Sequence, residues 1–190
     1  MNEAGYIKEI KASVKRLNQI VNNILDMTRL EAGALTPKQE WCEINEVIDR
    51  AIELAGHALD LYIVKVNIPE NMPVAKIDPS LLEQALFNIL LNVTQHTQVN
   101  TKICIVAKIT NHLLEISITD NGKGLPDGDL ERLFKPFVRG DSAPLGGSGL
   151  GLAIARGFIR IQNGDLVAEK PAEGGAKFII TIPAKLMEEK

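Results

Sequence analysis

The feature that most constrains this chain is a glycine-rich segment, residues 120–152, set between two regular stretches. Residues 113–119 before it (LLEISIT) are apolar and β-branched, which predicts a strand ending at Asp120. Residues 150–161 after it (LGLAIARGFIRI) return to helical spacing. Backbone N–H groups at a helix start, with no side chains in the way, can hold phosphate oxygens. The order of strand, glycine-rich loop and helix therefore predicts a nucleotide site.

Hydrophobic periodicity and turn residues predict an α+β domain around this segment. Asn45 and the pair Asp78-Pro79 are expected to cap two helices, and Asn111-His112 is expected to form a hairpin turn. The helices are predicted at 6–32, 45–58 and 80–95, and the other strands at 39–44, 61–68, 74–77, 101–110, 165–169 and 176–182. We expect a two-layer sandwich of a mixed, mostly antiparallel sheet and three helices, preceded by one long N-terminal helix.

The first predicted helix carries an apolar stripe with alternating three- and four-residue spacing. The stripe consists of Ile7, Ile10, Val14, Leu17, Val21 and Ile24. Such a stripe is typical of a coiled coil or helix bundle, and it needs another helix to cover it. That helix would come from a partner chain or from sequence outside this one. The alternative is that the stripe packs on the domain that follows.

Composition narrows the functional classes. The net charge is -3 without a block of basic residues, which disfavours nucleic-acid binding. The sequence contains neither an 18-residue apolar run nor a signal peptide, so we expect no direct membrane contact of this chain. Cys42 and Cys104 lie far apart and are expected to be reduced and structural. His57, His96 and His112 share no metal-ligand spacing.

Two asparagines interrupt the apolar helix predicted at 80–95. Asn88 and Asn92 are four residues apart and share one helix face. Asparagines on a helix usually face solvent, but these two flank Leu91 in its most apolar stretch. Neutral amide oxygens on one face can hold a divalent cation that keeps its waters and phosphate ligands.

The order of motifs resembles the ATP-binding domain of the GHKL superfamily, which includes sensor histidine kinases, gyrase-type topoisomerases, Hsp90-type chaperones and mismatch-repair ATPases. The resemblance rests on four motifs in order: Asn88-x-x-x-Asn92, Asp120-x-Gly122-x-Gly124, Phe134-x-x-Phe137 and Gly147-x-Gly149-x-Gly151. Residues 16–33 resemble the second helix of the dimerisation and phosphotransfer domain of bacterial sensor histidine kinases. Residues 133–140 (LFKPFVRG) resemble the kinase Phe box. The stretches DMTRLEAG and KQEW are similar to those of the osmosensitive, potassium-responsive KdpD type.

The resemblance implies ATP and Mg²⁺ as cofactors and assigns roles to particular residues. Asn92 would coordinate Mg²⁺ with Asn88 close by on the phosphate side, and Asp120 would accept a hydrogen bond from the adenine amino group. Arg139 would reach the γ-phosphate from a lid over residues 128–146 that is expected to be mobile, most of all at 140–147. The other nucleotide-contacting residues that it implies are Gln95, His96, Gly122, Gly124, Leu133, Phe134, Phe137, Gly147, Ser148, Gly149, Leu150 and Gly151.

The chain departs from the family pattern at the end of the helix that carries Asn92. Many members have a Lys-Tyr or Arg-Tyr pair where this chain has Gln95 and His96. Replacing a charged hydrogen bond by a neutral one predicts an ATP affinity about tenfold lower. His96 could compensate when protonated, or it could be a surface residue.

The implied function is that of the ATP-binding catalytic domain of a two-component sensor histidine kinase. The resemblance assigns residues 1–36 to part of a dimerisation domain and residues 37–190 to the catalytic domain. None of the histidines lies in a phosphoacceptor motif, so we expect this chain to bind ATP without autophosphorylating. The expected partners are a second copy, through the N-terminal helix, and the receiver domain of a response regulator. The expected location is cytoplasmic, in a full-length protein anchored in the bacterial inner membrane.

Two other functions remain open at the level of sequence. The first is a GHKL-type ATPase, although those ATPases carry a glutamate base where this chain has Asn88, and asparagine cannot accept a proton at neutral pH. The second is a nucleotide-sensing pseudokinase, which the neutral Gln95 and His96 keep open.

Overall fold

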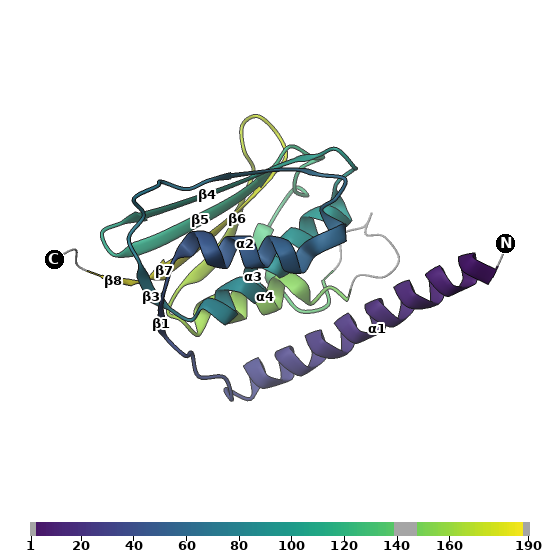
Figure 1. Cartoon of the computed structure of the whole chain (residues 1–190), viewed down its shortest axis with the longest axis horizontal. Coiled ribbons are helices and arrows are strands. Elements are labelled where there is room, and N and C mark those ends of the chain that lie inside the picture. The colour runs from purple at the N-terminus through teal and green to yellow at the C-terminus, as the bar shows by residue number, and fades with distance from the viewer. Residues whose placement is uncertain (1–2, 139–147, 188–190) are drawn as a thin grey trace.

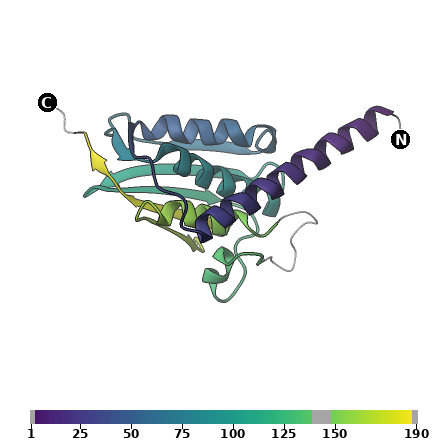
Figure 2. The same ribbon diagram turned by 90° about the horizontal axis from the view of Figure 1, so that it is seen from below.

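The computed structural model describes residues 3–138 and 148–187, and these form a two-layer α+β sandwich (Figure 1). Helices α2 (Ile44–Ala55), α3 (Pro79–His96) and α4 (Gly151–Arg160) cover one face of the larger sheet. Figure 2 shows the long helix α1 (Glu3–Glu31) crossing beside these helices, with its N-terminal turns reaching beyond them. The predicted fold class is confirmed.

The larger sheet has five strands in the order β2-β4-β5-β7-β6. β2 pairs with β4 in parallel, and the other three pairs are antiparallel, so the sheet is mixed and mostly antiparallel as predicted. The strands are β2 (Ile63–Asn67), β4 (Lys102–Thr110), β5 (Leu113–Asp120), β6 (Asp165–Glu169) and β7 (Ala176–Pro183). Asn111 and His112 join β4 to β5 with φ of 51° and 60°. These positive values are those of a tight two-residue hairpin turn.

Three short strands form a separate small sheet in the order β1-β3-β8. They are β1 (Glu40–Cys42), β3 (Ala75–Ile77) and β8 (Lys185–Leu186). The first two were predicted as strands but not as a second sheet. β8 and the 3₁₀ helix η2 (Leu130–Phe134) were missed, because elements this short carry no periodic pattern. The helix predicted at 45–58 ends at Ala55, and its last three residues form the 3₁₀ helix η1 (Gly56–Ala58).

The core lies between the helices and the larger sheet. Along β5, side chains alternate between the core and the outer face, and Leu114, Ile116 and Ile118 point inward. Leu82 and Ile89 of α3 are also fully buried. Burial on both layers holds β5 against α3, and the candidate site lies where these two elements end.

One predicted helix cap is confirmed and the other is wrong. Asp78 caps α3: its Oδ1 accepts the Leu81 N–H at 3.0 Å, and its Oδ2 accepts the Lys38 N–H at 2.6 Å. Asn45 is not the cap of α2, because the helix already begins at Ile44 with Glu43 at the cap position. Ile44 is buried in the core, so it joins the apolar face of α2 and extends that helix by one residue.

The apolar stripe of α1 is exposed along its length from Ile7 to Ile24. The last turns of α1 reach the domain, where Met27 and Leu30 pack against the core. Gly157 of α4 makes room for this contact, because a Cβ there would lie 2.6 Å from Cδ1 of Leu30. The alternative that the stripe itself packs on the following domain is therefore wrong. Within the described residues, none of the helices has both the length and the apolar content needed to cross a membrane.

Candidate nucleotide site

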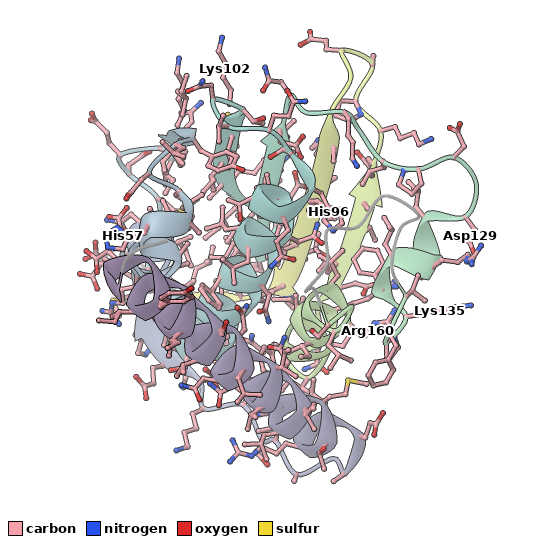
Figure 3. The ribbon with its side chains drawn as sticks, turned by 90° about the vertical axis from the view of Figure 1, so that its right-hand side faces the viewer. His57, His96, Lys102, Asp129, Lys135 and Arg160 are labelled. Carbon is pink, nitrogen blue, oxygen red and sulfur yellow. The ribbon has the colours of Figure 1, made fainter. Side chains whose placement is uncertain are left out.

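The predicted site residues gather at one end of the sandwich, where β5 and α3 end and α4 begins. Figure 3 looks onto this end: His96 lies near its middle, and Asp129 and Lys135, on the segment that follows β5, lie at its border. Residues far apart in the sequence meet here because the ends of β5 and α3 and the start of α4 lie at the same edge. Arg139 and Gly147, with the predicted lid residues between them, lie outside the described residues.

Asp120 is the buried acid of the site. Asp120 is the last residue of β5 and is only 4% exposed. Its Oδ1 accepts a hydrogen bond from the Gly122 N–H at 2.8 Å. Burial raises the pKa of Asp120, and hydrogen bonds from the backbone amides of Gly122 and Ala176 oppose that rise. An acceptor in such a buried position is suited to bind a donor on a flat, apolar ligand.

Two glycines beside Asp120, Gly122 and Gly175, have no room for a side chain. A Cβ at Gly122 would lie 2.5 Å from Cγ2 of Thr97, and one at Gly175 would lie 1.8 Å from the carbonyl oxygen of Asp120. Thr97 and Gly175 were missed as site residues. Gly174-Gly175 reads in sequence as an ordinary hairpin turn, and nothing local connects it with residue 120.

Asn88 and the start of α4 are neighbours. Asn88 is buried on α3, and a Cβ added to Gly151 would lie 4.0 Å from the Asn88 carbonyl oxygen. Asn92 is half-buried one turn further along the same helix face. The structure thus brings the backbone of α3 at Asn88 next to the first residue of α4.

Ser148 connects the glycine-rich loop with α1. Its Oγ accepts a hydrogen bond from Nδ2 of Asn23 at 3.2 Å and another from the Leu150 N–H at 3.3 Å. Asn23 is buried, and sequence reasoning missed it because it lies among the polar positions of a helix predicted to pack elsewhere. Leu150, which the resemblance lists among the nucleotide-contacting residues, packs in the core beneath the loop.

The predicted Phe pair is split between two environments. Phe134 is buried, Leu133 packs beside it against the core, and the guanidinium of Arg156 lies 4.7 Å from the Phe134 ring centroid. Phe137 is 71% exposed, so only Phe134 of the pair is a core residue. The Phe137 N–H donates to the Gly149 carbonyl at 3.0 Å, which ties the two sides of the loop together.

Gln95 and His96 supply no positive charge to the site in this state. Gln95 is exposed and neutral. Burial lowers the pKa of His96, and the nearby charge of Lys123 lowers it further. The imidazole is therefore unprotonated at neutral pH, which removes the basis for compensation by a charged histidine in the nucleotide-free protein.

Residues 77–186 match the family described as histidine kinase-, DNA gyrase B- and HSP90-like ATPase, HATPase_c. The chain belongs to this family. The matched HATPase_c region contains Asn88, Asn92, Asp120 and Gly151 and leaves α1 outside. The predicted family of ATP-binding domains, which includes those of histidine kinases, is confirmed.

Two relatives of this HATPase_c chain are sensor proteins named KdpD. It is 34% identical over 187 residues to the sensor protein KdpD of Escherichia coli, covering 98% of this chain and 21% of the relative. It is 32% identical over 189 residues to KdpD of Mycobacterium tuberculosis, covering 95% of this chain and 22% of the relative. The chain thus spans about a fifth of the length of these relatives.

Solved structures confirm the HATPase_c fold. The mycobacterial sensor histidine kinase MprB is 29% identical, with a TM-score of 0.67 over 79% of this chain and 100% of the other. Full-length ShkA in complex with AMPPNP is 23% identical, with a TM-score of 0.83 over 98% of this chain and 40% of the other. The second match extends over α1 as well as the domain, and at this identity it speaks for the fold alone.

Proposed function

We propose that the chain is the ATP-binding catalytic part of a KdpD-like sensor histidine kinase. It would bind ATP with Mg²⁺ and present the γ-phosphate to a histidine, from which the phosphoryl group passes to an aspartate of a response regulator. The observation that carries the proposal is the convergence of Asp120, Asn88 and Gly151, from three elements, on one end of the sandwich.

Each group is suited to one part of the nucleotide. The carboxylate of Asp120 would accept the adenine amino group, and the buried surroundings would exclude competing water. The backbone amides that follow Ser148 at the start of α4 would hold phosphate oxygens, since the positive end of a helix dipole favours anions. The amide oxygen of Asn92 would hold Mg²⁺, which supplies charge neutralisation, and Arg139 would contact the γ-phosphate.

The residue type at position 88 favours transfer to a histidine over hydrolysis. An amide cannot accept a proton at neutral pH, so Asn88 cannot activate water as a general base. It can donate and accept neutral hydrogen bonds, which suits orienting a phosphate rather than deprotonating a nucleophile.

The remaining assignments concern the larger protein. The exposed stripe of α1 would pair with the same stripe of a second copy, which gives residues 1–36 to dimerisation and residues 37–190 to catalysis. The receiver domain of a response regulator would be the second partner. The chain would work in the cytoplasm as part of a protein anchored in the bacterial inner membrane.

Calorimetry tests nucleotide binding directly. We expect ATP to bind the wild-type chain more tightly with Mg²⁺ than with a chelator. The variant Asn92→Ala should lose this dependence on Mg²⁺, because it lacks the amide oxygen. Gln84→Ala, which removes an exposed amide from the same helix, is the matched control and should bind as the wild type does. Failure of the wild type to bind ATP would refute the proposal.

Transfer in trans separates the possible activities. The chain is incubated with γ-labelled ATP and a separately prepared dimerisation domain of a sensor kinase that carries its phosphoacceptor histidine. Acid-labile label on that domain, and none on this chain alone, is the expected result. Phosphate release without an acceptor would indicate an ATPase, and ATP binding with neither reaction would indicate a nucleotide-sensing module.

A further inference from the structure

We propose that Arg156 is a positioning residue of the nucleotide site, which holds the segment 130–138 in register with the loop at the start of α4. The inference rests on the proposed function, because it concerns how the same site is kept ready for ATP. Helix α4 would then contribute twice to the phosphate-binding loop, through the glycines at its start and through Arg156.

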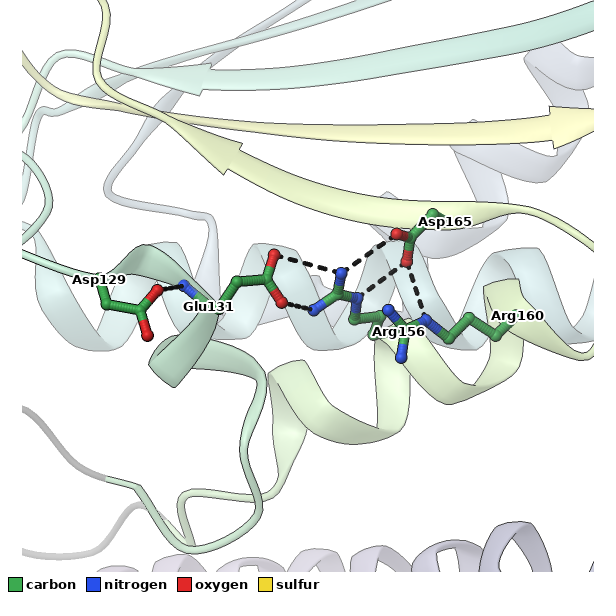
Figure 4. Close-up of polar contacts among 5 residues, drawn as sticks. All are labelled: Asp129, Glu131, Arg156, Arg160 and Asp165. Atoms are coloured by element: carbon green, nitrogen blue, oxygen red, sulfur yellow. Dashed lines mark hydrogen bonds and ion pairs between the residues drawn. The ribbon is translucent and has the colours of Figure 1, made fainter.

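Arg156 joins three elements through its guanidinium group (Figure 4). Towards η2, Nη1 and Nη2 donate to the two carboxylate oxygens of Glu131 at 2.5 and 3.3 Å. Towards β6, Nε and Nη2 donate to the two oxygens of Asp165 at 2.8 and 3.1 Å. Both pairs are bidentate, a geometry that the planar guanidinium group provides and a lysine cannot.

The guanidinium is in a largely buried position, so it needs a charged partner. The Arg156 residue is only 8% exposed, and a buried charge is costly unless it is paired and hydrogen-bonded. The hydrogen bond to Asp165 is the main cause that raises the pKa of Arg156, and the same bond is the main cause that lowers the pKa of Asp165. Both groups are therefore fully charged across the physiological range.

The two carboxylates are held unequally. Asp165 lies in β6 and also accepts Nε of Arg160 at 3.0 Å, so its place in the fold does not depend on Arg156 alone. Among the described residues, the carboxylate of Glu131 contacts Arg156 and no other cation. The Asp165 side therefore anchors Arg156 to the sheet, and the Glu131 side is the one through which Arg156 holds η2.

The held segment leads directly to the phosphate loop. Phe134, at the end of η2, stacks on the guanidinium of Arg156, and three residues later Phe137 bonds to the Gly149 carbonyl. A Cβ at Gly149 would lie 3.0 Å from the Phe137 carbonyl carbon, so the two sides of the loop are in contact at this point. Without Arg156, the segment would keep the backbone bond at Gly149 but would be free to turn about it. The amides around Gly149 would then lose their fixed direction.

The competing explanation is that these ion pairs only stabilise the fold. Single substitutions of Glu131 and of Asp165 distinguish this explanation from a role in nucleotide binding. Glu131→Gln and Glu131→Ala release η2 while Arg156 stays paired with Asp165. Asp165→Asn weakens the anchor in the sheet. Asp127→Asn removes an exposed carboxylate from the same loop and is the matched control. ATP binding is measured by calorimetry, adenosine binding by NMR shift changes, and folding by the melting temperature Tm.

We expect both Glu131 variants to bind ATP about five- to tenfold more weakly and adenosine as the wild type does, with Tm changed by no more than about 2 °C. Asp165→Asn should lower Tm further than either Glu131 variant does, because it weakens the anchor of a buried charge. Asp127→Asn should change neither affinity nor Tm.

Unchanged ATP affinity in the Glu131 variants would show that the network only stabilises the fold and would overturn the inference. Equal loss of ATP and adenosine would also overturn it, since it would indicate general distortion. Wild-type protein that binds no ATP would overturn the proposed function and this inference with it, whereas the first two outcomes leave the proposed function standing.

Discussion

The substitution Asp120→Asn separates nucleotide binding from stability. Asn has nearly the shape of Asp, and its Oδ1 can keep the 2.8 Å bond from the Gly122 N–H. The other side-chain position then becomes an NH₂ group, which cannot accept a hydrogen bond from the adenine amino group. A hydrogen bond to a charged acceptor contributes about 1.5–3 kcal/mol, so we expect ATP to bind roughly 10- to 150-fold more weakly.

The same substitution should stabilise the nucleotide-free protein at neutral pH. Burial raises the pKa of Asp120 above its unfolded value of 3.8. As pH rises through this window the unfolded chain ionises first, so the wild type loses free energy of unfolding between pH 3.8 and the folded pKa. The Asn variant lacks this loss, and its advantage over the wild type should grow with pH across the window and then stay constant.

Calorimetry with ATP and ADP gives the affinities, and urea unfolding from pH 3.5 to 7.5 gives the stabilities. ATP and ADP should lose affinity equally, because both carry adenine. Asp127→Asn, which removes a fully exposed carboxylate from the same loop, should bind both as the wild type does. A variant that binds ATP normally, or one whose stability falls relative to the wild type as pH rises, would refute this account of Asp120.

Three further predictions concern α3. Gln95→Lys should tighten ATP binding about tenfold by calorimetry. Gln98→Lys adds the same charge just beyond the helix and should leave the ATP affinity unchanged. Equal gains in affinity for both variants would point to a nonspecific charge effect. In the nucleotide-free protein, NMR titration of His96 should give a pKa below 6.5, and the free energy of unfolding should fall as pH drops through that value because the unfolded chain takes up the proton first. Asp78→Ala should lower the free energy of unfolding by about 2 kcal/mol in urea, since it removes the helix cap and the acceptor for Lys38, and a loss below about 0.5 kcal/mol would contradict the capping role.

The sequence carries enough information to predict the elements that are long and periodic. The strand ending at Asp120 and the helix ending at His96 follow from alternation and helical spacing, and with them the two-layer fold. The start of α2 was misplaced by one residue because an asparagine is a common cap, while the burial of Ile44, which decides the start, depends on the tertiary fold. Local signals cannot resolve such a conflict.

Much of the candidate site could be predicted from the order of the motifs. The residues that contact it from elsewhere in the fold could not. Asn88, Asp120 and Gly151 stand out by residue type and spacing. The contacts of Asn23 with Ser148 and of Gly175 with Asp120 join residues 125 and 55 positions apart in the chain. The ion pairs of Arg156 likewise depend on how η2, α4 and β6 pack in the tertiary structure, which local sequence patterns do not indicate.

The position of β7 has a consequence for how the protein is made. β7 is one of the last strands along the chain, yet it lies inside the sheet between β5 and β6 and pairs with β5 over its full length, from Leu113↔Pro183 to Asp120↔Ala176. While a ribosome is still synthesising residues 176–183, β5 therefore has an open edge, and Asp120 lacks the strand that fixes its backbone. Open edges can pair with other chains, so the nascent protein is most prone to aggregate just before synthesis of the domain ends.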